Sequence, residues 1–126
     1  MRELLLVGGG GFLGSISRFL LSAALTRFQT DGATGALPVG TLAVNVVGCL
    51  IIGLLAGAGG NGNVWSDATR RFLFTGVLGG FTTFSAFGHE TFSLARDGRL
   101  SLAVANALLQ VGCGLLAVWA GYRIAS

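Results

Sequence analysis

Charge, lysine, proline and cysteine are all scarce in this 126-residue sequence, and each shortage excludes a class of protein. Charged residues make up 10% of the chain, whereas soluble domains carry about 25%, so the sequence cannot coat a water-facing globule or remain disordered. Two cysteines are too few for a disulfide scaffold, and the 22 glycines follow no collagen period. Hydrophobic residues supply 52% of the chain. The composition therefore predicts an integral membrane protein whose main solvent is a lipid bilayer.

Catalytic motifs and basic patches are also missing. The sequence has no nucleophile beside a base, no paired carboxylates and no phosphate-binding Gly-Lys-Ser loop, so we do not expect an enzyme. The net charge of +3 comes from scattered arginines, which argues against a nucleic-acid partner. Cys49 and Cys113 lie within apolar runs and are expected to be buried small hydrophobes.

Long apolar stretches dominate what is present. They cover residues 4–26, 41–60, 71–95 and 100–122. Each reaches the length of about 20 residues that a helix needs to cross the hydrocarbon core. We therefore predict an all-α fold in which residues 1–126 form one transmembrane domain of four helices. Thr41 is expected to cap the second helix, because threonine is a favoured N-cap residue.

The arginines specify the orientation of these spans only weakly. One side of the membrane would carry four arginines and the other three, whereas the positive-inside rule needs a clear excess. The chain is therefore expected to insert in both directions and to form an antiparallel homodimer about an axis in the membrane plane. The two sets are Arg2, Arg70, Arg71 and Arg123 on one side, and Arg27, Arg96 and Arg99 on the other.

The third span contains an unusual polar segment, Gly79-Gly-Phe-Thr-Thr-Phe-Ser-Ala-Phe87. Adjacent glycines followed by three hydroxyl residues are poor material for a regular helix. A broken membrane helix is tolerated only where protein or a watery cavity covers the freed backbone, and such breaks bind ions. We predict that this helix is discontinuous. The alternative is an unbroken, glycine-packed helix whose hydroxyls bond to the preceding turn.

Polar side chains inside the spans are the candidate functional residues, because burying them in hydrocarbon is costly. Asn45 offers an amide donor, although joining helices is its alternative role. Arg18 must snorkel, pair or face a vestibule, and Glu90 is its candidate counter-ion. Phe84 and Phe87 can share one helix face, where their positive ring edges suit an anion; plain packing is the alternative. Donors and ring edges with few acids favour a small anion over a cation.

Three motifs, in this order, resemble the Fluc (CrcB) family of fluoride channels. They are Gly14-Ser-Ile-Ser-Arg18, Gly40-Thr-Leu-Ala-Val-Asn45, and the segment from Gly79 to Phe87 with Glu90 after it. The resemblance covers the whole chain, and the fourth span is its least diagnostic part. It implies a passive channel in the bacterial inner membrane that exports toxic fluoride, built as an antiparallel dimer with two pores. The sequence departs from the family pattern at Ala86 and Gly88, where hydroxyl residues are common.

The same resemblance implies roles for individual residues of this chain. The positions implied to line the fluoride pore are Asn45, Thr83, Phe84, Ser85 and Phe87. The phenylalanines would form a pair of pore rings, and the asparagine would donate to fluoride. Arg18 is implied to support conduction near a vestibule, and Glu90 to lie near the polar track. The backbone carbonyls of Gly79 and Thr82, from both subunits, are implied to hold a structural sodium ion, Na+, at the dimer centre.

Two other functions stay open at this point. A coupled fluoride–cation transporter is one, although the sequence lacks the intramembrane carboxylate pair that proton coupling needs. A small-residue-rich assembly subunit that conducts nothing is the other. Fluoride efflux from liposomes that contain only this protein separates the assembly subunit from a channel, because a channel needs no partner.

Overall fold

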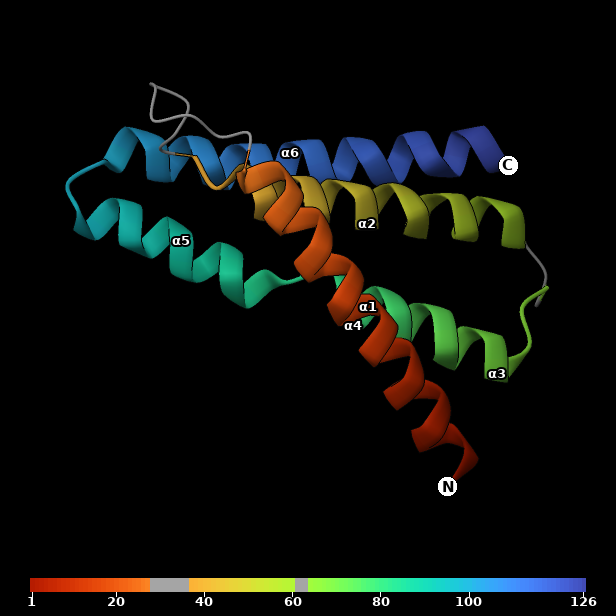
Figure 1. The fold of residues 1–126 in the computed structure, drawn as a ribbon. Helices are drawn as coiled ribbons and strands as arrows, with labels where there is room; N and C mark the ends of the chain where they lie inside the picture. The colour runs from red at the N-terminus through yellow and green to blue at the C-terminus, as the bar shows by residue number, and fades with distance from the viewer. Residues whose placement is uncertain (28–36, 61–63) are drawn as a thin grey trace.

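The computed structural model describes residues 1–27, 37–60 and 64–126, and these ranges are helical apart from short connections, with no strand among them (Figure 1). Its elements, in chain order, are α1 (Arg2–Thr26), α2 (Val39–Gly59), α3 (Asp67–Arg70), the π-helix η1 (Arg71–Leu78), α4 (Gly79–Phe81), α5 (Phe84–Arg96) and α6 (Leu100–Ala125). The predicted all-helical class is confirmed for the described residues.

Three helices are long and apolar enough to cross a membrane: α1, α2 and α6, with 25, 21 and 26 residues. They coincide, to within a few residues, with the predicted ranges 4–26, 41–60 and 100–122. Their surfaces are apolar as well as their sequences, because large side chains such as Phe12 and Leu115 are each 67% exposed. A water-soluble monomer does not leave so much apolar surface uncovered. The chain is therefore an integral membrane protein with several spans.

The predicted range 71–95 is divided into two helical pieces. Elements α3, η1 and α4 follow one another without a gap from Asp67 to Phe81, and α5 begins at Phe84. Between them, Thr82 and Thr83 have extended backbone, with ψ angles of 159° and 110°. In Figure 1 the two pieces lie roughly end to end, and α1 crosses over the point where they meet. The first piece also contains a π-helical stretch, a rare geometry that is frequent at functional sites.

Side-chain caps explain where these two pieces begin. The Ser66 hydroxyl accepts the Thr69 N–H at 3.2 Å and starts α3. The Thr83 hydroxyl accepts the Ala86 N–H at 3.2 Å and starts α5. Both bonds satisfy a donor that has no intrahelical partner. The expected cap at Thr41 is wrong, because α2 starts two residues earlier, at Val39, and Thr41 lies inside its first turn.

Glycines allow the helices to pack backbone against backbone. Helices α2 and α6 run side by side in the same direction, while α1 packs on η1 and α4 (Figure 1). A methyl group on Gly14 would collide with the Val77 carbonyl of η1, and one on Gly53 would collide with the Val118 carbonyl of α6. These close approaches are typical of membrane helices, where small residues let backbones meet. They bring the break at Thr82 and Thr83 close to both α1 and α2.

Candidate functional site

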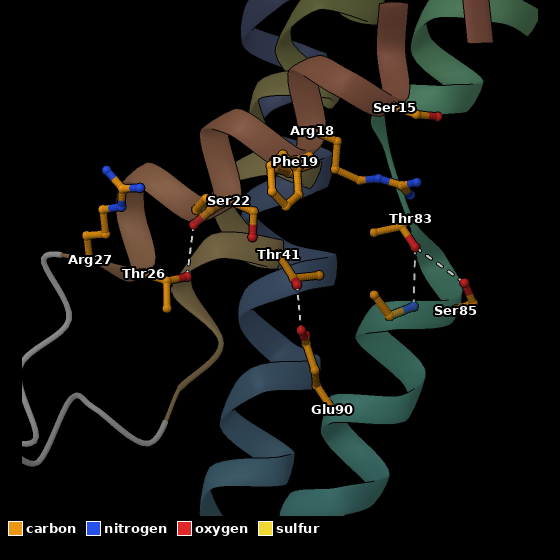
Figure 2. Close-up of a pocket in the computed structure, with 13 residues that line it drawn as sticks. Ser15, Arg18, Phe19, Ser22, Thr26, Arg27, Thr41, Thr83, Ser85 and Glu90 are labelled. Carbon is orange, nitrogen blue, oxygen red and sulfur yellow. Dashed lines mark hydrogen bonds between the residues drawn. The ribbon is translucent and has the colours of Figure 1, made fainter. Parts of the chain in front are cut away.

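A cavity of about 870 Å³ opens between α1, α2 and the start of α5, and we call it the vestibule (Figure 2). Most of the residues that line it are polar, with serine, threonine, arginine and glutamate side chains from the three helices. The residues used below are Arg18, Thr41, Thr83, Ser85 and Glu90. Figure 2 shows these side chains converging on one space, whereas Arg27 points away from it. Four of the sequence-predicted residues therefore share this cavity, and Thr41 joins them.

Arg18 connects α1 to the helix break. Its side chain is half-buried, and Nη1 donates to the Thr82 carbonyl at 3.4 Å. That carbonyl belongs to extended backbone, so Arg18 supplies a partner that helix geometry does not. The expected pairing of Arg18 with Glu90 is not found, since neither side chain forms an ion pair among the described residues. The guanidinium therefore lines the vestibule without a carboxylate partner among the described residues.

Glu90 is bound by α2 rather than by an arginine. The Thr41 hydroxyl donates to Glu90 Oε1 at 2.6 Å (Figure 2). The other carboxyl oxygen, Oε2, is buried and has no hydrogen-bond partner in the described part of the chain. Sequence reasoning assigned Thr41 to a helix cap and so missed this contact, which joins positions 49 residues apart. Only the polarity of Thr41 at the start of an apolar span could have pointed to it.

Asn45 holds the helix break from α2. Thr83 N–H donates to Asn45 Oδ1 at 2.9 Å, and Asn45 Nδ2 donates to the Thr83 carbonyl at 3.2 Å. In a regular α-helix the Thr83 N–H would have bonded to the Gly79 carbonyl. The Asn45 side chain thus replaces the backbone bonds that the break removes. Its second Nδ2 proton goes to Gln110 Oε1 on α6, at 3.0 Å.

A second cavity, of about 380 Å³, lies on the other side of the break, and we call it the phenyl cavity. Phe84 and Phe87 line it, with ring centroids 5.3 Å apart and planes at 66°, so one ring presents its edge to the other. Its other walls include Asn45, Gln110, and the sodium candidates Gly79 and Thr82. Thr83 lines both cavities and therefore marks the point where they approach each other.

Two functional candidates of α6 escaped the sequence analysis. Gln110 contacts Asn45, and Asn106, one turn away, donates to the Thr91 hydroxyl of α5 at 2.8 Å. Both amides are more than nine-tenths buried. They were visible in the sequence as isolated polar residues in an uncharged span. What the sequence did not show was which neighbouring helix each one faces.

The arrangement of donors suits an anion more than a cation. Backbone and side-chain N–H groups, ring edges and one arginine surround the helix break, and a single carboxylate lies near it. No cluster of three or more histidine, cysteine, aspartate or glutamate side chains that could hold a metal occurs in residues 1–27, 37–60 and 64–126.

Comparison with known proteins decides the family. A family model described as "CrcB-like protein, Camphor Resistance (CrcB)" matches residues 5–122. The chain belongs to the CrcB family. It is 42% identical over 124 residues to a protein of Methylobacillus flagellatus named "Fluoride-specific ion channel FluC", covering 98% of this chain and 94% of that one.

Other CrcB relatives carry the same name. A Rhizobium meliloti protein named "Fluoride-specific ion channel FluC" is 45% identical over 124 residues, covering 98% of this chain and 96% of its own. A Clostridium perfringens protein of that name is 40% identical over 121 residues, with coverage of 96% and 91%. The similarity to these proteins over nearly the whole chain confirms the resemblance to the CrcB family that the three motifs indicated.

Proposed function

We propose that this chain is a fluoride-selective ion channel. The observation that carries the proposal is the helix break at Thr82 and Thr83, where an amide network and two phenyl rings line a cavity of about 380 Å³ in a membrane protein. The channel names of its CrcB relatives support the same function. The alternatives, a coupled transporter and a non-conducting subunit, have no comparable observation in their favour.

The proposed path runs from the vestibule past Thr83 to the phenyl cavity. Arg18 attracts the anion into the vestibule, where Ser85 and the Thr83 hydroxyl can replace water molecules. Beyond Thr83, the edges of Phe84 and Phe87 offer positive electrostatic potential without a charged side chain. A weak, multi-site path of this kind lets an ion leave as readily as it binds.

We further propose that α3, η1, α4 and α5 together make a fourth crossing, and that two chains assemble as an antiparallel dimer. The Phe84 side chain is 82% exposed in the single chain, although the proposed role places it in a pore. A second chain that covered this face would enclose the rings and the apolar surface of α1. Bacterial inner membrane is the proposed location, with fluoride leaving the cytoplasm down its gradient.

A structural sodium ion at the dimer centre fits the backbone at the break. The Gly79 carbonyl loses its helical donor because Thr83 N–H binds Asn45, and the Thr82 carbonyl receives one bond from Arg18. Unpaired carbonyls in hydrocarbon are costly, and oxygen donors without carboxylates suit a hard, weakly charged cation. Gly79 and Thr82 from both subunits would hold it. When bound, the ion would supply positive potential near the anion path.

Fluoride efflux from liposomes that contain only this protein tests the proposal. We expect rapid fluoride efflux when the membrane potential is clamped with a potassium ionophore, and far slower efflux of chloride. The rate should not depend on a gradient of protons or sodium, which would instead indicate a coupled transporter. Equal rates for the two anions, or no efflux of either, would contradict the channel function.

A further inference from the structure

Helix α5 is not held in place by a continuous backbone helix. The extended residues Thr82 and Thr83 separate it from α4, so the helical hydrogen bonds that would fix its rotation relative to α4 are interrupted. Its rotation about its own axis therefore depends on side-chain contacts with the neighbouring helices. Because α5 carries both Phe84 and Phe87, this rotation also decides how the two rings meet.

Helix α6 supplies one of these contacts through two consecutive hydrogen bonds. Asn106 Nδ2 donates to the Thr91 hydroxyl at 2.8 Å, and that hydroxyl donates to the Phe87 carbonyl, also at 2.8 Å. A carbonyl oxygen only accepts, so Thr91 must give its single hydroxyl proton to Phe87. The Asn106 atom beside the hydroxyl must then be the nitrogen, which fixes the direction of this amide. We call these three residues the α6–α5 link.

Asn106 is placed to fix a position rather than to touch an ion. It is 1% exposed, and neither it nor Thr91 is among the described residues that line the vestibule or the phenyl cavity. It stands on α6, whose backbone packs directly on α2, since a methyl group on Gly53 would collide with the Val118 carbonyl. The α6–α5 link therefore joins a closely packed helix pair to a helical piece whose own backbone connection is interrupted.

A hydrogen bond between α6 and α5 does what apolar packing cannot. Hydrophobic contact is non-directional, whereas a buried amide donor is satisfied only at one register and one rotation of its partner helix. Hydrogen bonds between membrane helices add little to stability, because the unfolded chain in the membrane also finds partners. The main consequence of the link is therefore the direction of α5.

We propose that Asn106 is a positioning residue of the channel, which acts through Thr91 to fix the rotation of α5 and hence the place of the Phe87 ring. This inference rests on the proposed fluoride channel and adds a residue that affects the anion path without touching the anion. Phe87 lies one turn before Thr91 on the same face of α5, and its ring centroid is 5.3 Å from that of Phe84. Loss of the link lets α5 rotate and loosens this ring pair.

Replacing both partners of the link separates position from stability. In an Asn106→Leu/Thr91→Val variant the new side chains keep the branched shapes of the old ones and leave neither partner unpaired, so the unfolding temperature in detergent should stay close to wild type. Fluoride efflux from liposomes should fall at least about 10-fold, since small misplacements in a preorganised site reduce its function steeply. Thr91→Ser keeps the hydroxyl and is the matched control, with efflux like wild type.

NMR of labelled phenylalanine rings reports the position itself. The chain has nine phenylalanines, and the Phe87 signals are those missing from a Phe87→Ile sample. In the double variant the Phe87 signals should shift, because they depend on the ring of Phe84 beside them. The signals of Phe12 on α1, identified in the same way, should stay in place. Thr91→Ser should leave both sets where wild type has them.

Wild-type efflux from the double variant would overturn the proposal, wherever its ring signals lie. Reduced efflux with unmoved Phe87 signals would overturn it too, because the effect would then not pass through the ring. If the double variant does not fold, Asn106→Leu alone provides the same test, since it leaves only a spare acceptor on the Thr91 hydroxyl. Absence of fluoride efflux from wild-type liposomes contradicts the channel function instead, and the ring signals then still test whether Asn106 positions Phe87.

Discussion

At the scale of single residues, the role proposed for the two phenylalanines is that an apolar side chain serves an anion through its ring edge. Phe84 and Phe87 meet edge to face, so the positive edge of one ring is turned toward the face of the other, and the remaining ring edges carry the same positive potential. An aliphatic side chain of similar volume fills the same room but has no such edge. Ring polarity and hydrophobic packing can therefore be separated by one substitution.

Phe84→Ile and Phe87→Ile should each reduce fluoride efflux by at least about 10-fold while the protein stays folded, because the ring edges are lost and most of the apolar volume is kept. Efflux from liposomes and elution of the purified protein as a single symmetric species are the two measurements. Phe92→Ile is the control that should leave efflux unchanged, because this ring is 65% exposed and lies five residues beyond Phe87 on α5. Wild-type efflux from both variants would show that Phe84 and Phe87 contribute only hydrophobic packing.

Asn45→Asp should abolish most of the fluoride flux and lower the stability of the fold only slightly. The new carboxylate can still accept the Thr83 N–H, but its second oxygen faces the Thr83 carbonyl and Gln110 Oε1. We expect Gln110 to reverse its amide and donate Nε2 to the acid, so the fold survives, while the new carboxylate adds a like charge beside the proposed anion path.

Liposome efflux and thermal unfolding in detergent separate these two effects of Asn45→Asp. Efflux should fall at least about 10-fold, while the stability loss stays near 1–3 kcal/mol, the cost of an imperfectly paired buried group. Unchanged efflux would show that a negative charge at position 45 does not matter to the ion.

The sequence indicated some of these residues and not others for a physical reason. Asn45, Phe84 and Phe87 stood out because polar residues and paired rings are conspicuous in an apolar span. Gln110 was equally conspicuous, yet its contact with Asn45 joins positions 65 residues apart. Helix periodicity says which residues share a face, but it does not say which face meets which helix. That information exists only once α2 and α6 are packed.

At the scale of the elements, the polar segment was recognisable, but its geometry was not. Gly79 and Gly80 suggested the place where the helix would unwind. In the structure both glycines are part of α4, and the backbone is instead extended at Thr82 and Thr83. The glycines instead provide close packing, since a methyl group on Gly80 would meet the Gly11 carbonyl at 2.5 Å. The π-helix η1 left no sign in the sequence, because a stretch of this kind depends on tertiary contacts.

Gly14→Ala should destabilise the packing of α1 on the divided helix. The added methyl group would overlap the Val77 carbonyl, and backbone cannot move aside as a flexible side chain can. Overpacking of this kind costs about 1–3 kcal/mol, to be measured as a lower unfolding temperature in detergent. Gly8→Ala lies on the same helix with nothing within 4 Å of the new methyl group and should unfold like wild type. Equal stability of the two variants would show that α1 does not pack on η1 in this register.

At the scale of the whole molecule, the arginines bear on the orientation in which the chain crosses the membrane. Seven of its eight arginines divide four to three between the two proposed faces, so the electrostatic preference for either orientation is small. A chain that inserts both ways supplies both halves of an antiparallel dimer from one gene product. The exposed Phe84 ring and the Gly79 carbonyl, which does not receive the Thr83 N–H, are features that such a partner would cover.

The orientation can be measured at the C-terminal residue. In a chain whose cysteines at positions 49 and 113 are replaced by alanine, Ser126→Cys provides a single thiol next to α6. A membrane-impermeant maleimide added to intact cells should label about half of these thiols, and permeabilised cells should be labelled completely, because the arginine balance favours neither direction. Arginines appended after residue 126 should hold the C-terminus in the cytoplasm and reduce external labelling, since added positive charge restores a clear bias. Complete labelling or complete protection of the unmodified C-terminus in intact cells would instead show one fixed orientation, and an antiparallel dimer could not form from such chains.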